Sequence, residues 1–341
     1  MTHLNEELEE ESRRNTGIYK RFPLSFFIRW DVWKACLHCR PRKVEGLYAK
    51  LSLAENPWTS LIMIDVPRTF THSLRIPQST LESLGRILNA YANLNPEVGY
   101  CQGMNFLVGL LLRVLAPSAT YISLEEEEEV YWMFVCLMDY DNLRDFYRDG
   151  FPLLMKYTIA FYEVMKMEIP DLLSHFDKEG ISPSLFLHQW YLSLFINCLP
   201  FPTVLILWDS LIAGGLPVII TLTVSLLKVL KNVLIKMEFE QIIKFFKTMR
   251  NGDEECDAQI IGQLLVKQAG LITIPKEVLR SLAAPAPVVS TPPRKESPWT
   301  IPVIPIFNTD ESVTPPPGPS SPSLFDRVSS AFSWNSVGSD D

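Results

Sequence analysis

Three short segments in the first third of the chain carry the side chains best suited to chemistry. They are Arg29-Trp-Asp-Val-Trp33, Ile62-Met-Ile-Asp65-Val-Pro-Arg68 and Gly99-Tyr100-Cys-Gln102-Gly-Met-Asn105. An arginine guanidinium is a planar fork of donors that suits phosphate oxygens, and a glutamine amide can both donate and accept hydrogen bonds. Each segment also has a purely structural interpretation. The first is then a stacked or paired helix face, the second an intrahelical ion pair and the third a loop that starts a helix.

The sequence lacks the patterns that would make the chain a self-contained nucleotide, metal or acyl-transfer enzyme. It contains no G-x-x-x-x-G-K-[ST], G-x-G-x-x-G, H-E-x-x-H or G-x-S-x-G. Its five histidines show no metal-ligand spacing. Cys36 and Cys39 form a C-x-x-C without a second ligand pair, so two thiols on a core helix are favoured over a zinc or redox site.

The elements that position these segments are expected to be helical throughout. Apolar residues recur every three or four positions after Pro77-Gln78-Ser79, which predicts a helix that ends near Asn95-Pro96. A second helix is expected from about Gln102 to Leu115, and no alternating strand of convincing length appears. Further helices are expected to begin near Glu126, Pro152, Ser184, Pro202, Val218, Glu238 and Glu254. The predicted fold class is therefore all-α, with more than ten helices.

Taken together, the three segments resemble the signature motifs of the TBC domain family, which contains Rab GTPase-activating proteins. Those motifs are R-x-x-x-W, I-x-x-D-x-x-R and Y-x-Q, and all three occur here in that order. Trp190 to Phe195, Leu199-Pro200 and Trp208-Asp209 are similar to the family's second helical lobe, so the resemblance covers about residues 23–270. It implies a two-lobed, multi-helix domain. Trp30 and Thr71 depart from residues common in the family, without affecting the expected catalytic positions.

The resemblance implies a function as a GTPase-activating protein that supplies catalytic residues to a Rab-type small GTPase in its GTP-bound form. Arg68 would be an arginine finger at the γ-phosphoryl group, and Gln102 would position the attacking water. GTP and magnesium would belong to the partner, so no cofactor is expected, and the chain would not itself be a hydrolase. The alternatives are a catalytically silent Rab-binding scaffold and a helical adaptor that does not contact a GTPase. The motifs do not identify the Rab.

The remaining motif residues are expected to support the two fingers. Asp65 is expected to pair with a cation, with Arg29 as the candidate, and so to hold the segment that carries Arg68. Tyr100 and Asn105 are expected to contact the GTPase or to orient the Gln102 loop, and Trp33 is expected in the core.

Composition narrows the function classes further. The formal net charge is −8, with 31 basic and 39 acidic residues, and without a basic stripe nucleic acid is a poor partner. The acidic runs Glu6 to Glu11 and Glu125 to Glu129 are interpreted as solvated or flexible segments, the second lengthening a variable loop. The apolar stretch from Phe195 to Leu227 is interrupted by prolines, glycines and Asp209, which favours a buried helical hairpin over a membrane span.

The predicted domains are an acidic N-terminus (1–16), the TBC domain (17–282) and a Pro/Ser-rich disordered tail (283–341), where roughly half of the 26 prolines lie. The N-terminus lacks a signal-peptide pattern, so a cytoplasmic protein is expected, with peripheral endomembrane association through the partner or the tail as a hypothesis. The tail suggests proline-directed phosphorylation, a polyproline ligand at 302–305, and an amphipathic helix. The candidate phosphorylation sites are Thr291, Ser297, Thr314 and Ser321. The apolar face of the helix would be formed by Leu324, Phe325, Val328, Ala331 and Phe332.

Overall fold

A computed structural model describes residues 26–39, 43–70, 77–117, 121–250 and 255–284, together with residue 324. Within these ranges the secondary structure is helical and contains no strand, which confirms the predicted all-α class. Glu6 to Glu11, Thr71 and the tail with its three hypotheses lie outside the described residues. The exceptions in the tail are residues 283 and 284, at the end of the last described helix, and Leu324, whose side chain is buried.

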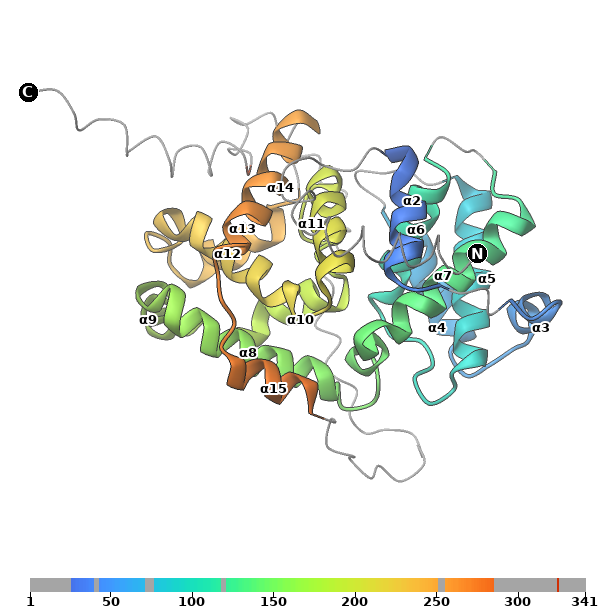
Figure 1. Ribbon diagram of the computed structural model, residues 1–341, viewed down its shortest axis with the longest axis horizontal. Helices are drawn as coiled ribbons and strands as arrows, with labels where there is room; N and C mark the ends of the chain where they lie inside the picture. Colours follow the sequence, from blue (N-terminus) through green and yellow to red (C-terminus); the bar gives the residue numbers. More distant parts are fainter. Residues whose placement is uncertain are drawn as a thin grey trace, which may run out of the picture.

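The helices form two lobes that follow one another along the chain (Figure 1). The first lobe contains α2 (Phe26–Cys36), α3 (Leu47–Leu53), α4 (Thr59–Asp65), the 3-10 helix η1 (Val66–Arg68), α5 (Gln78–Leu94), α6 (Met104–Leu115) and α7 (Leu124–Asp139). The 3-10 segment η2 (Tyr140–Phe146) leads into the second lobe. That lobe contains α8 (Pro152–Glu168), α9 (Pro170–Glu179), α10 (Ser184–Leu192), α11 (Phe201–Gly214), α12 (Val218–Leu234), α13 (Phe239–Thr248), α14 (Glu255–Ala269) and α15 (Lys276–Ala283).

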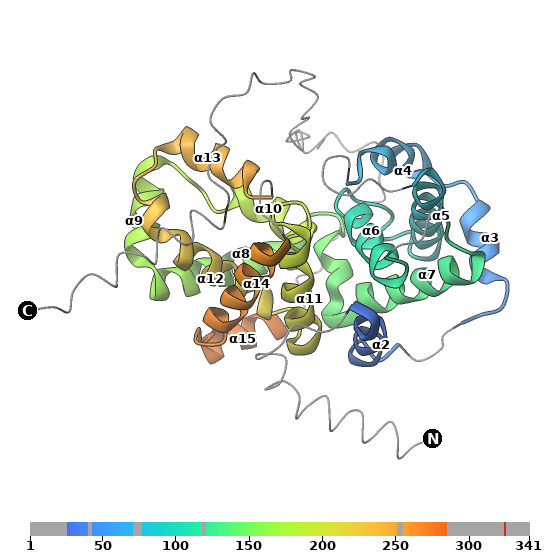
Figure 2. The same cartoon turned by 90° about the horizontal axis from the view of Figure 1, so that it is seen from above.

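Each lobe is built around helices that are apolar on more than one face. In the first lobe α5, α6 and α7 pack against one another, and almost every side chain of α6 is buried. In the second lobe α12 packs against α8, α11 and α14. Helix α2 contacts both α6 and α11 and so joins the lobes, as the view from above also shows (Figure 2). The motif residues on α2 therefore lie where the two lobes meet.

The predicted helical hairpin is confirmed. Helices α11 and α12 are joined at Gly215, whose φ of +86° suits a residue without a side chain, and the next amide, of Leu216, donates a hydrogen bond to Asp141 at 2.7 Å. Thr203, Thr223 and Ser225 are buried, and each hydroxyl donates to a backbone carbonyl. Within the described residues, no helix combines the length and the apolar character needed to span a bilayer.

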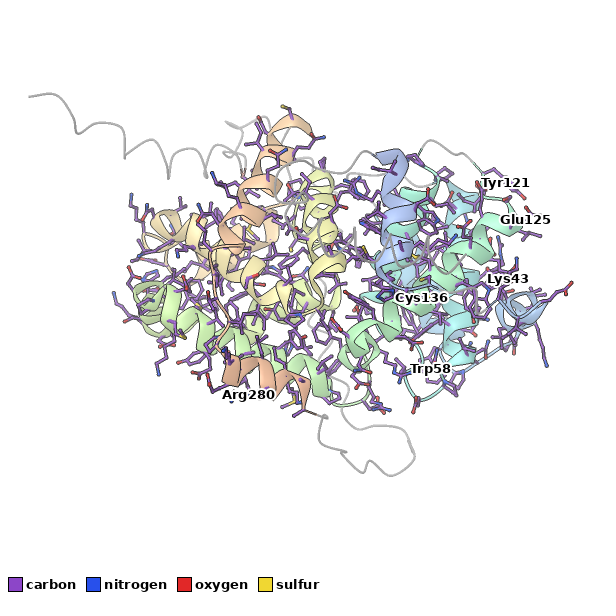
Figure 3. All side chains as sticks on the ribbon, in the orientation of Figure 1. Lys43, Trp58, Tyr121, Glu125, Cys136 and Arg280 are labelled. Carbon is purple, nitrogen blue, oxygen red and sulfur yellow. The ribbon has the colours of Figure 1, made fainter. Side chains whose placement is uncertain are left out.

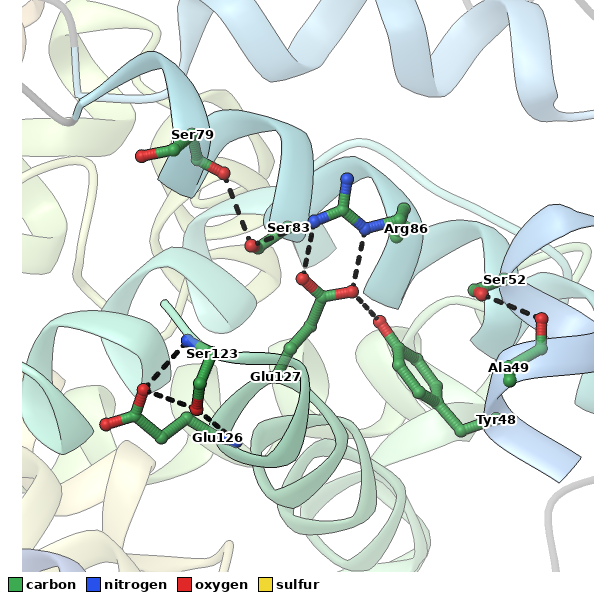
Figure 4. A network of polar contacts seen from close by, with 9 residues as sticks. All are labelled: Tyr48, Ala49, Ser52, Ser79, Ser83, Arg86, Ser123, Glu126 and Glu127. Atoms are coloured by element: carbon green, nitrogen blue, oxygen red, sulfur yellow. Dashed lines mark hydrogen bonds and ion pairs between the residues drawn. The ribbon is translucent and has the colours of Figure 1, made fainter. Parts of the chain in front are cut away.

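The prediction that Glu125 to Glu129 forms a solvated, loop-lengthening run is wrong. These residues form the first turns of α7, which begins with a capping box between Ser123 and Glu126. The side chain of Glu127 is fully buried, where it accepts hydrogen bonds from Arg86 at 2.6 and 2.8 Å and one from Tyr48 (Figure 4). Successive helical residues are about 100° apart, so a run of five charges reaches every face, including the inner one.

The neighbouring acidic side chains of this run tie α7 to other elements. Glu129 accepts hydrogen bonds from Lys34 at 2.7 Å and from Trp30 at 2.9 Å, both on α2, and Glu128 pairs with Lys43 at 2.8 Å. Glu125 is exposed at the outer end of the helix (Figure 3). The helix expected to begin near Glu126 is thus present and begins at Leu124, and the pattern Ser-x-x-Glu at 123–126 is the local signal for its capped start.

Candidate functional site

The second motif occupies α4 and η1, and its helical spacing separates buried from exposed residues. Ile62 and Asp65, three positions apart, face the core, whereas Arg68 is exposed at the end of η1. Phe70, with a φ of +59°, then turns its ring into the core, where it packs on Phe106 with ring centroids 5.9 Å apart. The backbone that carries Arg68 is therefore fixed at both ends.

Asp65 binds a tyrosine rather than the cation expected from the sequence. The Tyr100 hydroxyl donates to the Asp65 carboxylate at 2.9 Å, and both side chains are buried. Burial raises the pKa of the Asp65 carboxyl, an effect that the Tyr100 hydrogen bond and the positive charge of Arg68 oppose. Burial and the adjacent carboxylate raise the pKa of Tyr100 well above its ordinary value, so its hydroxyl remains a donor.

Asn105 connects the two segments that carry Arg68 and Gln102. Its amide nitrogen donates to the Thr69 hydroxyl at 2.9 Å, and its amide oxygen accepts from the Gly103 backbone N–H at 3.0 Å. The Thr69 hydroxyl in turn donates to the Asp65 carbonyl at 3.1 Å. Because Thr69 follows Arg68 and Gly103 follows Gln102, one buried amide sets the spacing between the two segments.

Gln102 lies half-buried in the connection between α5 and α6, which depends on two glycines. Gly99 has a φ of +64°, and a side chain there would overlap the indole of Trp58 at the start of α4. Gly103 has a φ of +114°, and a Cβ there would lie 2.5 Å from the carbonyl oxygen of Leu192 in the second lobe. The loop is thus packed closely against both lobes.

Arg29 pairs with Asp209 across the lobe interface, which corrects its predicted pairing with Asp65. Two guanidinium nitrogens donate to the two carboxylate oxygens at 2.8 and 3.0 Å, a bidentate arrangement. The indole of Trp33 donates to the same carboxylate at 2.9 Å, and its ring packs on Trp208 with centroids 5.4 Å apart. Trp33 is buried, as predicted. Arg29 and Asp209 lie 180 positions apart, so helical spacing could not reveal their pairing.

The arrangement presents a cationic fork and an amide to a molecule outside the chain. Arg68 is exposed and Gln102 half-exposed, and Asp65, Tyr100 and Asn105 are buried behind them. In the part of the chain that the structure describes, no group of three or more His, Cys, Asp and Glu side chains is placed to hold a metal ion. A guanidinium and an amide at the surface can together donate hydrogen bonds to an anionic group.

A family model for the Rab-GTPase-TBC domain matches residues 27–235, which is more than half of the chain. The chain belongs to the Rab-GTPase-TBC domain family. The matched part of this TBC domain contains all three motifs and Asp209, and the helices continue beyond it to Ala283.

The curated relatives of this TBC domain that follow share between 27% and 29% sequence identity with it. They include GTPase-activating protein GYP5 of Saccharomyces cerevisiae (29% identity, covering 64% of this chain and 23% of the yeast protein). Ecotropic viral integration site 5 protein homolog of Homo sapiens is 27% identical, covering 70% of this chain and 28% of the human protein. Growth hormone-regulated TBC protein 1 of Xenopus tropicalis is 28% identical, covering 62% of this chain and 61% of the Xenopus protein. The chain spans about a quarter of the length of the first two relatives.

Solved TBC domains share the fold. The Ypt/Rab-GAP domain of Gyp1p aligns with a TM-score of 0.62 at 22% identity, covering 79% of this chain and 94% of that domain. The flagellar RabGAP TBC domain of Chlamydomonas aligns with a TM-score of 0.60, also at 22% identity, covering 75% of this chain and 83% of that one. This confirms the TBC-type fold expected from the motifs.

Proposed function

We propose that this TBC domain is a GTPase-activating protein for a Rab-type small GTPase and supplies Arg68 and Gln102 to the partner's nucleotide site. The observation that carries the proposal is the Asn105 amide, which joins the residues following Arg68 and Gln102 at 2.9 and 3.0 Å. An exposed guanidinium and a half-exposed amide, on segments held together by one buried side chain, are suited to acting on one group. The names of two relatives, GYP5 of yeast and eat-17 of Caenorhabditis elegans, describe them as GTPase-activating proteins.

The proposed chemistry concerns charge that develops on the γ-phosphoryl group during hydrolysis. The Arg68 guanidinium would donate to phosphoryl oxygens, a contribution worth roughly 10³- to 10⁵-fold in rate where an arginine finger has been measured. The Gln102 amide would accept a hydrogen bond from the attacking water and donate toward the phosphoryl group. GTP and Mg²⁺ would be bound by the GTP-loaded partner, so the TBC domain would need no cofactor. Its role would be in vesicle trafficking on endomembranes.

Apolar side chains extend the proposed contact surface beside Arg68. Leu61 and Ile64, which are 43% and 52% exposed, lie on the solvent-facing side of α4, seven and four residues before Arg68. A GTPase that receives Arg68 in its nucleotide site would lie against this side. The pair would then contribute to partner affinity and choice.

The test is single-turnover GTP hydrolysis by a panel of Rab proteins with the wild-type chain and with Arg68→Ala and Gln102→Ala. Arg280→Ala and Gln263→Ala are the matched controls, because both residues are exposed on the second lobe, Arg280 on α15 (Figure 3). The proposal expects acceleration of at least one Rab, with most but not all of that acceleration lost in each finger variant and all of it kept in both controls. GTP-dependent binding that survives without any acceleration would instead make the domain a silent Rab-binding scaffold.

A further inference from the structure

The carbonyl oxygen of Leu192 lies at the contact between the second lobe and the Gln102 loop. Leu192 ends α10, and its carbonyl accepts a hydrogen bond from the Tyr147 hydroxyl at 2.9 Å. The same oxygen is the nearest atom to the missing Cβ of Gly103, at 2.5 Å. We infer that Tyr147 is a positioning residue for Gln102. It acts through the Leu192 carbonyl, which lies directly against Gly103. The catalytic part of this inference rests on the proposed function.

Tyr147 is buried beside the Gln102 loop. It is 3% exposed, and its hydroxyl donates to the Leu192 carbonyl, which lies against Gly103. Burial, with a smaller effect of the Cys101 thiol, raises the pKa of Tyr147 well above its ordinary value, so the hydroxyl stays a donor. The next residue, Arg148, pairs with Glu97 in the same loop at 3.2 Å. The segment that links the lobes thus contacts the loop at several points.

The turn that follows Leu192 is linked to the first motif through Trp208. The chain after α10 turns through Leu194 and Phe195 with φ values of +44° and +68°, so a specific contact must maintain this turn. The Trp208 indole supplies one by donating to the Leu194 carbonyl at 2.9 Å. Trp208 packs on Trp33, and the adjacent Asp209 binds both Trp33 and Arg29. A continuous set of contacts therefore runs from the first motif to the loop of the third.

The side chain of Tyr147 allows a conservative test. Tyr147→Phe keeps the buried ring and removes only the hydroxyl, and Tyr162→Phe on α8, where the tyrosine is 37% exposed, is the matched control. In single-turnover assays on a responsive Rab, Tyr147→Phe is expected to lower the maximal rate roughly 10-fold, which is comparable with the loss of one hydrogen bond. The concentration of the TBC domain that gives half of the maximal rate is expected to stay unchanged. The control is expected to match the wild type.

A double-mutant cycle separates positioning of Gln102 from general loss of structure. In the Gln102→Ala background, Tyr147→Phe is expected to cause no further loss of rate, because there is no amide left to position. In the Arg68→Ala background it is expected to cause the same roughly 10-fold loss as in the wild type. Equal losses in both backgrounds, or an unchanged rate in the single variant, would overturn the inference.

A measurement without a GTPase distinguishes this inference from the proposed function. Hydrogen exchange of peptides covering residues 95–105 is expected to be faster in Tyr147→Phe than in the wild type, and unchanged in Tyr162→Phe. If exchange is faster but the wild type accelerates no Rab, the structural coupling stands and the proposed function fails. If exchange at 95–105 is unchanged, Tyr147 does not hold the loop and the inference is wrong.

Discussion

Asn105 donates a hydrogen bond from its side-chain amide to the Thr69 hydroxyl at 2.9 Å, although the two residues come from different motifs. Both side chains are buried, and the other end of the same amide accepts from Gly103. The sequence pattern Y-x-Q ends at Gln102, yet the residue three positions later sets where the glutamine loop lies relative to Arg68. The geometry of the site thus depends on a buried side chain outside the Y-x-Q pattern.

Replacing Asn105 by alanine is expected to impair both fingers together. The change removes two buried hydrogen bonds and should cost about 2 kcal/mol of stability. Because both loops are then freed, the rate of Rab GTP hydrolysis should fall roughly 10²-fold. Asn89→Ala is the matched control, since Asn89 is a buried amide of the same lobe that binds the Ser52 and Ala54 carbonyls. The amide oxygen of Asn89 also accepts from Asn56 and Thr59, so Asn89→Ala should lose at least as much stability while keeping its rate. Equal rate losses in the two variants would contradict a specific role for Asn105.

Asp65 should give the domain a stability that declines as pH rises through the acidic range. Burial raises the pKa of its carboxyl above the ordinary value of 3.8, so the folded state retains the proton at a pH where the unfolded chain has lost it. The carboxyl therefore favours folding most below 3.8, and this contribution is lost as pH rises through the folded-state pKa. In Asp65→Asn an amide oxygen can still accept from Tyr100.

The stability of Asp65→Asn relative to the wild type should therefore increase with pH. Urea unfolding of both proteins from about pH 3 to pH 7 measures this difference. Asp31→Asn, at an exposed position on α2, serves as the control and should show a smaller trend. A relative stability of Asp65→Asn that falls with pH would show that Tyr100 and Arg68 outweigh burial.

The helices could be predicted more completely than the contacts between them. The helix starts at Pro152, Ser184 and Val218 agree with the structure, because apolar spacing and proline are local signals. Arg68 and Gln102 were identified through a resemblance whose motifs are also local. The Arg29–Asp209 pair was missed because it joins residues 180 positions apart, and Tyr147 because nothing around it in sequence marks it. Glu127 was misassigned because its neighbours share its charge.

Arg29→Lys is expected to destabilise the domain although it keeps the positive charge. A lysine ammonium cannot make the bidentate bonds at 2.8 and 3.0 Å to Asp209, and the site is buried. Breaking such a pair costs about 3 kcal/mol, or roughly 10 °C in melting temperature for a domain of this size. Thermal unfolding measures the change, with Arg280→Lys as the exposed control. A shift as small as the control's would mean that charge alone suffices at this site.

Ile64→Asp is expected to weaken partner binding without changing the chemical step. Ile64 is 52% exposed on α4, four residues before Arg68, so a carboxylate there would be desolvated against a bound GTPase. The concentration of the TBC domain that gives half of the maximal rate in the Rab assay should rise roughly 10-fold, and the maximal rate should be preserved. Leu53→Asp, at a 79% exposed position that ends α3, should leave both unchanged. A loss in maximal rate alone would mean that Ile64 supports the Arg68 segment rather than the contact.

Glu127 should show the opposite pH dependence to Asp65. Burial acts to raise the pKa of its carboxyl, but hydrogen bonds from Arg86 and Tyr48, with the positive charge of Arg86, outweigh it and hold that pKa below the ordinary value of 4.5. The unfolded chain therefore binds the proton first, so the stabilisation is present above pH 4.5 and is lost as pH falls through the folded-state pKa. Glu127→Gln should remove it, at a cost of about 3 kcal/mol at neutral pH.

The difference in unfolding free energy between wild type and Glu127→Gln should thus be largest near neutral pH and shrink below pH 4.5. The matched control is Glu125→Gln, two residues earlier in the same acidic run but exposed, which should change stability by less than about 0.5 kcal/mol. If both variants were equally stable, the run would act as the uniform solvated surface that its composition suggests. If only Glu127→Gln is destabilised, a single inward-facing carboxylate anchors α7 to Arg86 on α5 and to Tyr48 on α3.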